Sequence, residues 1–298
     1  MHIFYALKRM SKASDFPPFV VATRIHLGRQ KTPPPQSKLN STVKSFLGLA
    51  SSIGAAKASI AVDSQPKIEG YDLVQAIEEA IVHASKNLTE TEEVRVECDI
   101  VRVSPWGNFI LPLNALIAWA CTTKLPNDLT AKSILFVSAE MSLTSDSVRD
   151  LHQVMDSDTL VVGAVLPGHD YKGRQDERET VVELNGRTCP WNTAAMWNLE
   201  KVGLFGFPLV AEGILKDEEG KYVPGGIEEF STILLQQKIF SPDQMKAKLM
   251  KVTGVEWEQK FEDAERRLWH ETKMKSKFTR AEAHRELLGV EKGFVIHC

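Results

Sequence analysis

The sequence lacks the features that define several broad classes of protein. Its 298 residues contain only four cysteines, and none of them forms a Cys-x-x-Cys pair; they are Cys98, Cys121, Cys189 and Cys298. Such wide spacing argues against a disulfide framework or a zinc knuckle and favours reduced thiols, so we expect a cytoplasmic protein. No stretch approaches the roughly 18 consecutive apolar residues of a membrane-spanning helix. The formal net charge is −3, so we expect neither nucleic acid nor a membrane as partner.

Several common nucleotide-binding and catalytic motifs are also missing. The sequence has no GxxxxGK[ST] P-loop, no GxSxG elbow and no GxGxxG fingerprint. Residues 24–28 and 273–277 faintly resemble the two ATP-binding signatures of class I aminoacyl-tRNA synthetases. The first has Arg29 where its last histidine belongs and is soon followed by three prolines, and the second carries an inserted lysine. These departures argue against that family.

Four short apolar runs predict buried strands. They cover residues 19–25, 58–63, 133–138 and 160–166. Segments with helical apolar spacing alternate with them, at residues 39–53, 71–84, 113–122 and 145–155. A half-polar run at 94–101 predicts a further strand near a sheet edge. This alternation predicts an α/β fold with a mostly parallel, Rossmann-like sheet flanked by helices.

The second half of the sequence has a different character. Residues 191–200 and 226–237 predict helices, and residues 203–226 are rich in glycine and proline. From residue 242 onward the chain is strongly charged and predicts mainly helix. We therefore expect three segments: a flexible leader over 1–17, a catalytic-type domain over 18–240 and a helical C-terminal extension over 241–298 that packs on it.

Five short segments follow one another in an order that is informative. They are the strand Val20–Arg24, the strand Ile60–Asp63, the helix start Pro112–Asn114, the strand Ile134–Glu140 and the acidic pair Glu228–Glu229. Over about residues 19–240 this order resembles the GT-A-fold glycosyltransferases, in the manner of family 2 enzymes. The resemblance implies a GT-A-like domain that binds a nucleotide-diphospho-sugar at the carboxyl ends of its strands. It also implies a transferase of the hexosyltransferase type acting on an unidentified acceptor.

The resemblance assigns roles to individual positions. Those implied to bind the nucleotide-sugar are Thr23, Arg24, Asp63, Asn114, Ser138 and Glu140. Those expected to contact the acceptor are His169, Asp170, Trp191 and Asn192, because they follow a predicted strand or offer an aromatic face to a sugar. Glu228 and Glu229 correspond to the acids that deprotonate the acceptor hydroxyl. Glu229 is the preferred base, because the family's base is usually the second acid.

One position departs from the family pattern. The Asp-x-Asp that chelates the diphosphate-bound metal is replaced by Ser138-Ala139-Glu140. A hard divalent cation prefers several oxygen ligands, so we expect weak Mn²⁺ or Mg²⁺ binding, with Glu140 and the late histidine His297 as ligands. The same departure supports an alternative, a catalytically inactive GT-A-like protein that binds or regulates.

Most of these residues also have an ordinary structural interpretation. Asp63 is well placed to form a turn before Pro66. Acids in the first turn of a helix stabilise its dipole, and tryptophans usually belong to a core or an interface. The basic residues near the C-terminus either close over a diphosphate or form a solvated, ion-paired helix. They include Lys273, Lys275, Lys277 and Arg280.

Overall fold

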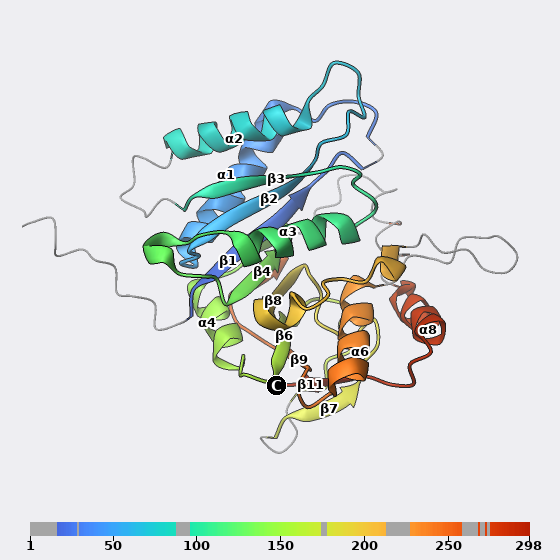
Figure 1. Cartoon of the computed structure of the whole chain (residues 1–298). Helices are drawn as coiled ribbons and strands as arrows, with labels where there is room; N and C mark the ends of the chain where they lie inside the picture. Colours follow the sequence, from blue (N-terminus) through green and yellow to red (C-terminus); the bar gives the residue numbers. More distant parts are fainter. Residues whose placement is uncertain are drawn as a thin grey trace, which may run out of the picture.

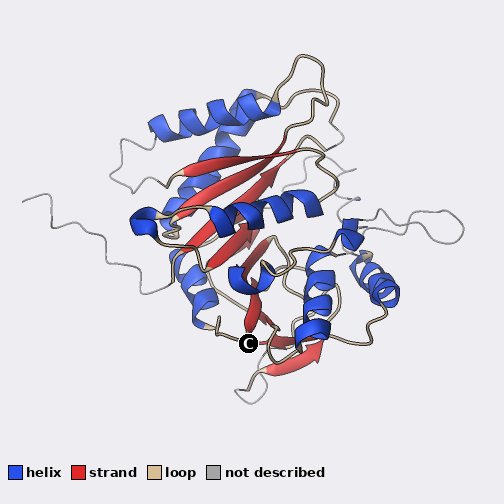
Figure 2. Cartoon of the chain, viewed as in Figure 1, coloured by secondary structure: helices blue, strands red, loops and turns tan. Residues whose placement is uncertain are grey.

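A nine-stranded sheet with helices on both of its faces forms the centre of the protein (Figure 2). The computed structural model describes residues 17–28, 30–87, 96–173, 178–212, 227–257, 268, 272 and 275–298. In order across the sheet, the strands are β3 (Cys98–Val103), β2 (Lys57–Asp63), β1 (Phe19–Ile25), β4 (Ser133–Val137), β8 (Ala194–Asn198), β6 (Thr159–Ala164), β9 (Lys246–Met250), β11 (Phe294–His297) and β7 (Thr180–Glu183). All strands except β8 and β7 point the same way, so the sheet is mostly parallel.

Helices and short strands complete the architecture. The described helices are α1 (Gln36–Ser52), α2 (Leu73–Asn87), α3 (Ile110–Thr122), η2 (Pro126–Asp128), α4 (Ser145–Gln153), α5 (Leu199–Val202), η3 (Leu209–Glu212), α6 (Glu228–Phe240) and α8 (Lys277–Leu288). A small antiparallel sheet joins β5 (Met141–Ser142) to β10 (Glu256–Trp257). In Figure 1, α3 passes in front of the first strands, α1 lies behind them, and α8 stands beside α6. Among the residues that the structure describes, no helix has both the length and the apolar character needed to cross a membrane.

The position of α3 follows from the direction of the chain. The chain steps from β1 to β2 to β3 in one direction through α1 and α2. It then reverses through α3 to reach β4 on the other side of β1. Because parallel crossovers are right-handed, a reversal of direction places the connecting helix on the opposite face of the sheet.

The centre of the sheet is packed from both faces. Val21 of β1 pairs with Ala58 of β2 on one side and with Leu135 of β4 on the other, and all three are fully buried. Burying a valine or leucine side chain contributes about 1.5–3 kcal/mol relative to leaving it in water. Strands buried on both faces are apolar throughout, and this is the pattern that the sequence displays.

The α/β architecture predicted from the sequence is confirmed. The four apolar runs correspond to β1, β2, β4 and β6 with boundaries within two residues of the prediction. The half-polar run corresponds to β3, which lies at the edge of the sheet as expected. The helix expected at 226–237 is α6, and it opens with the acidic pair Glu228–Glu229. Pro112 lies in the first turn of α3.

The helix predicted over residues 191–200 is wrong. Residues 194–198 form β8, which runs antiparallel between β4 and β6, and only residues 199–202 are helical. Ala195, Met196 and Trp197 are fully buried in this central strand. A short run that is apolar on every side has no periodicity, and such a run cannot be distinguished from a buried helix by pattern alone.

The expected helical C-terminal extension is also wrong. The described part of residues 241–298 contains α8, but it also supplies β9 and β11 to the central sheet. Residue 240 is therefore not the end of the sheet-forming domain. The sequence of β9, Lys-Ala-Lys-Leu-Met, buries Ala247 and Leu249 while its many charges suggested helix. Of the leader expected over residues 1–17, residues 1–16 lie outside the described residues.

Candidate functional site

The carboxyl ends of the parallel strands define where a ligand would bind. The chain leaves β1 toward β2 on one side and returns through β4 on the other, so the strand order switches between β1 and β4. Open α/β sheets bind ligands beyond the carboxyl ends of their strands at such a switch. Asp63 ends β2 and Glu140 follows β4, so both carboxylates lie at this edge, as predicted. Two strand spacings, about 10 Å, separate their strands.

Arg24 and Glu228 meet at the switch point. Arg24 lies near the end of β1, and its Nη1 donates a hydrogen bond to the Phe109 carbonyl at 3.2 Å. Its Nη2 lies 3.9 Å from Oε1 of Glu228, which begins α6. The two side chains are 27% and 16% exposed, so both are accessible to a ligand. The structure therefore brings together two residues that were expected to bind nucleotide-sugar and to accept a proton.

Glu229 points inward from the same helix turn. It is only 4% exposed, and its Oε1 accepts a hydrogen bond from the backbone N–H of Asn192. Burial, with a further contribution from the charge of Glu228, raises the pKa of Glu229 to about 7. Neighbouring residues on a helix point about 100° apart, so one acid can face solvent while the next faces the core. The geometry therefore favours Glu228, not the preferred Glu229, as the acid that a ligand reaches.

Two basic residues of α8 complete a charged cluster, defined here as Arg24, Glu228, Glu229, Lys277 and Arg280. Lys277 is 7% exposed, and its Nζ lies 3.4 Å from the centroid of the Trp191 ring. The charge of Lys277 favours the ionised form of Glu229, opposing the effect of burial on its pKa. Arg280 lies near enough to both acids that their charges counteract the lowering of its pKa by burial.

Asp63 and Thr23 are buried, and the contacts of Asp63 stabilise the local fold. The Asp63 side chain is buried, and it accepts a hydrogen bond from the Gln65 backbone N–H at 3.1 Å. Lys67 Nζ lies 2.6 Å from its other oxygen. These contacts are those of a turn-forming aspartate after a strand. Thr23 is buried within β1.

Asn114 holds a turn instead of standing at the surface of the site. Its Nδ2 donates to the Phe207 carbonyl at 2.9 Å, and its Oδ1 accepts from the Phe207 N–H at 2.7 Å. The preceding Gly206 has φ +67, and a Cβ there would collide with Oδ1 of Asn114. Glycine is therefore required at 206, both for the left-handed backbone and for the close approach.

The residues expected to contact the acceptor are mostly internal. The His169 ring stacks on Trp191 with 3.6 Å between centroids, and Trp191 is 1% exposed. Nδ1 of His169 accepts from the Leu166 N–H, which leaves Nε2–H to donate to the Cys189 carbonyl. Burial lowers the pKa of His169 to about 3, so the ring is neutral. Asn192 is buried and serves the site through its backbone N–H to Glu229.

Asp170 is the exception, because it lies at the surface. It forms an ion pair with Arg187 at 3.0 Å, in which both side chains are more than 40% exposed. Its backbone N–H also donates to the Arg187 carbonyl. An exposed pair of this kind contributes little to stability.

Glu140 and His297 do not form a metal site together. Nδ1 of the buried His297 accepts from the Lys172 N–H at 2.9 Å, and Nε2 lies 3.4 Å from the Thr188 carbonyl, so both ring nitrogens are engaged. Glu140 accepts from the Ser138 hydroxyl at 2.7 Å. Three strands lie between β4 and β11, a separation of about 19 Å. Within the described ranges, no three His, Cys, Asp or Glu side chains gather as a metal-binding group would.

Glu212 is a buried carboxylate that the sequence analysis missed. It accepts hydrogen bonds from the backbone N–H groups of Asn108, Phe109 and Ile110 at the start of α3. Gly107, with φ +66, makes this possible, because a Cβ there would collide with Oε1 of Glu212. The helix start and its capping acid are far apart in the sequence, and the acid ends the short helix η3. No local signal could therefore identify the contact.

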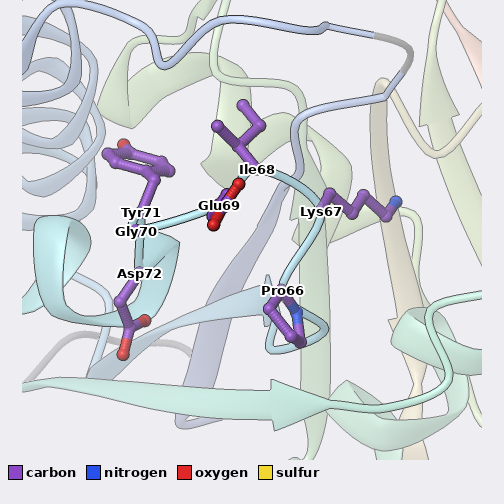
Figure 3. Close-up of a pocket in the computed structure, with 7 residues that line it drawn as sticks. All are labelled: Pro66, Lys67, Ile68, Glu69, Gly70, Tyr71 and Asp72. Carbon is purple, nitrogen blue, oxygen red and sulfur yellow. The ribbon is translucent and has the colours of Figure 1, made fainter.

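An open pocket lies just after the carboxyl end of β2, beyond Asp63. Figure 3 shows that its seven lining residues come from one continuous loop, Pro66–Asp72, between β2 and α2. The Lys67 side chain in this loop points away from Tyr71 and Asp72 and pairs with Asp63. A pocket made by one loop offers no set of convergent groups from several elements, which is the usual mark of a ligand site.

Comparisons with known proteins add no assignment to this geometry. The sequence matches no protein-family model, and no curated protein matches it either. The site is therefore characterised by its own chemistry. Its two carboxylates and three cationic side chains come from β1, α6 and α8. They converge beside the switch point of a mostly parallel sheet.

Proposed function

We propose that the protein is a GT-A-like glycosyltransferase that moves a hexosyl group from a nucleotide-diphospho-sugar to an acceptor hydroxyl. One observation carries the proposal. The acidic pair Glu228–Glu229 lies beside Arg24 at the carboxyl end of β1, although the two segments are far apart in the sequence. A carboxylate placed at a ligand-binding edge is what proton removal from an acceptor requires.

The strand order supports nucleotide binding at this edge. The strand order β3-β2-β1-β4 is that of the mononucleotide-binding half of doubly wound folds. In such folds the ligand crevice lies at the carboxyl ends of the strands, where the strand order reverses next to β1. Fold alone does not establish an activity, so the proposal depends on the charged cluster and not on the sheet.

Glu228 is the proposed general base. Its carboxylate is partly exposed and faces Arg24, whereas Glu229 is buried and held by the Asn192 N–H. In the reaction, Glu228 takes the proton of the acceptor hydroxyl while the oxygen attacks the anomeric carbon. The bond from that carbon to the phosphate oxygen breaks, and its electron pair leaves with the nucleoside diphosphate. Cationic side chains stabilise the charge that develops on this leaving group.

The test is binding followed by turnover. The full chain is mixed with a panel of nucleotide-diphospho-hexoses, with either Mn²⁺ or EDTA present, and its Tm is measured. A true donor should raise the Tm by mass action, and the matching nucleoside monophosphate should raise it less. Release of nucleoside diphosphate is then followed with a panel of sugar, lipid and peptide acceptors. If no nucleotide-diphospho-hexose in the panel shifts the Tm, the proposed function is wrong.

A second candidate is a nucleotide-sugar-binding protein without catalysis. It is favoured by one observation, namely that Ser138 and Glu140 do not reproduce a pair of carboxylates at the expected metal position. This candidate predicts the same Tm shift as the enzyme but no nucleoside diphosphate release above the rate of spontaneous hydrolysis. The turnover measurement therefore separates the two.

A further inference from the structure

We propose that Arg24, Lys277 and Arg280 bind the diphosphate of the donor directly, with no divalent metal ion between the phosphates and the protein. This inference rests on the proposed function and specifies how the same site neutralises its ligand. It assigns phosphate binding to Lys277 and Arg280 of the charged cluster.

The donor set at the expected metal position does not fit a hard cation. Such ions require several oxygen ligands at once. Here the only carboxylate at that position is Glu140, and Ser138 already donates its hydroxyl proton to it. The other expected ligand, His297, uses both ring nitrogens on backbone groups. Within the described ranges no other carboxylates or histidines assemble into a substitute.

Helix N-termini are another common phosphate-binding device. Those of α2, α3 and α4 are already occupied by the protein's own side chains, whereas α1, α6 and α8 begin without a side-chain cap. Asp72 accepts from two backbone N–H groups of the first turn of α2. Glu212 accepts from three at the start of α3. Thr144 accepts from Ser147 at the start of α4. A phosphate at any of these helix starts would have to displace an acid or a hydroxyl.

The three cations, in contrast, converge from two elements onto the start of α6. Arg24 reaches Glu228 from the end of β1. Lys277 and Arg280 are three residues apart on α8, so they lie on the same face of that helix. This is the face that packs against α6, because Ser231 of α6 lies 3.3 Å from Nδ1 of His284, a further turn along α8. Figure 1 shows the two helices side by side.

The cations of the charged cluster are of the kind that binds phosphate. Of its five side chains, three are cationic and two are the carboxylates Glu228 and Glu229. Protonation of Glu229, whose pKa burial raises to about 7, lowers the negative charge beside the cations. The diphosphate of a nucleotide-sugar is a dianion at neutral pH. Guanidinium and ammonium groups bind phosphate oxygens through charge-assisted hydrogen bonds.

The experiment is calorimetric titration of the full chain with UDP, GDP and inorganic pyrophosphate, each in EDTA and again in Mn²⁺. We expect at least one nucleoside diphosphate to bind in EDTA, with a Kd that Mn²⁺ changes by less than about threefold. Lys277→Met and Arg280→Met should each weaken that binding by roughly tenfold or more, since each removes a charge-assisted contact. Arg149→Met, an exposed cation on α4 paired with Asp146, is the matched control and should leave the Kd unchanged.

Each outcome decides between the claims. Binding that requires Mn²⁺ overturns this inference and leaves the proposed function standing. Binding in EDTA that neither variant weakens overturns the assignment of these cations. No binding of any nucleoside diphosphate under either condition overturns both the inference and the proposed function. Because Lys277 is buried against Trp191, its variant can unfold, and the more exposed Arg24→Gln then serves as the second variant with the same expected loss.

Discussion

The two sides of the central sheet are built on different chemistry. The side made of β3, β2, β1 and β4 buries mostly apolar side chains, with a few polar exceptions such as Lys57, Ser59 and Asp63, and its helices cross the sheet in regular order. The side made of β8, β6, β9, β11 and β7, with α6 and α8, buries many polar and charged groups. These include Glu229, Gln236, Gln237, Lys248, Lys277, His284 and His297. Burying such groups is costly unless each is paired, so this side is organised by specific partners and the first side by packing.

The largest expected effect is on catalysis and concerns the acidic pair Glu228–Glu229. Glu228→Gln should lower the transfer rate by about 10²-fold or more, because a general base typically contributes 10²–10⁴-fold. The Tm should change little, since the side chain is partly exposed and Gln keeps its shape. Transfer is measured with saturating donor, and binding of nucleoside diphosphate is checked in parallel. Glu229→Gln is the matched control. If it alone abolishes transfer, Glu229 is the base and our assignment is reversed.

The second prediction concerns the apolar side of the sheet. Ile60 is fully buried in β2, so Ile60→Ala should lower the free energy of unfolding by about 2–5 kcal/mol through lost burial and a new cavity. The nucleoside diphosphate Kd of the folded fraction should stay unchanged. Denaturant unfolding measures the first quantity, and calorimetry below the new Tm measures the second. Val82→Ala on the exposed face of α2 should cost less than about 0.5 kcal/mol. A large loss of affinity in Ile60→Ala would show that the two sides are not independent.

A smaller effect is expected at the carboxylate that caps α3. Glu212→Gln replaces an acceptor of three backbone N–H groups with an amide that has one oxygen, so it should cost about 1–3 kcal/mol of stability. Glu200→Gln, at an exposed acid in the first turn of α5, is the control and should cost a few tenths of a kcal/mol. Equal losses of stability in the two variants would mean that the cap formed by Glu212 stabilises the protein no more than an exposed acid at a helix start does.

The last prediction uses pH. The pKa of Glu229 is raised in the folded state from 4.5 to about 7, so folding favours its protonated form. Its contribution to stability is therefore fully present below about pH 4.5 and is lost as the pH rises toward 7. Glu229→Gln should flatten the stability profile between these values and be closest to the parent at low pH. Parallel Tm curves for the two proteins between pH 5 and pH 8 would contradict this account.

The same contrast explains what the sequence could predict. Strands β1, β2, β4 and β6 were found because a parallel strand buried on both faces must be apolar, and short apolar runs stand out. β8 was missed because its run is equally apolar but gives no period. β9 was missed because it is short and lies in a charged region where helix was the better match to the pattern. β11 was missed because it is a mostly apolar run of only four residues at the end of a segment expected to be helical.

The site was predicted in part, for a related reason. Glu228 and Glu229 were singled out by the resemblance to GT-A-fold enzymes and by their place at the start of a predicted helix, and the edge shared by Asp63 and Glu140 follows from parallel strands. The contacts of Glu212, Lys277 and Arg280 depend on segments that meet only in the folded chain. The basic run near residue 277 was a signal, but it fitted a solvated helix equally well. His169 and Trp191 carry the residue types of a sugar site, yet they stack on each other inside the protein.

The antiparallel strand β8 also constrains the order in which the sheet assembles. β4 and β6 precede it in the chain but do not pair with each other, because β8 fills the space between them. The two sides of the sheet therefore join only when residues 194–198 return to pair with residues 133–137 and 161–163. Closing loops of this length costs entropy before any hydrogen bond compensates for it, and such pairings slow folding. The chain must thus hold two unpaired strand edges, those of β4 and β6, until β8 arrives, and these edges are where misassembly between copies would begin.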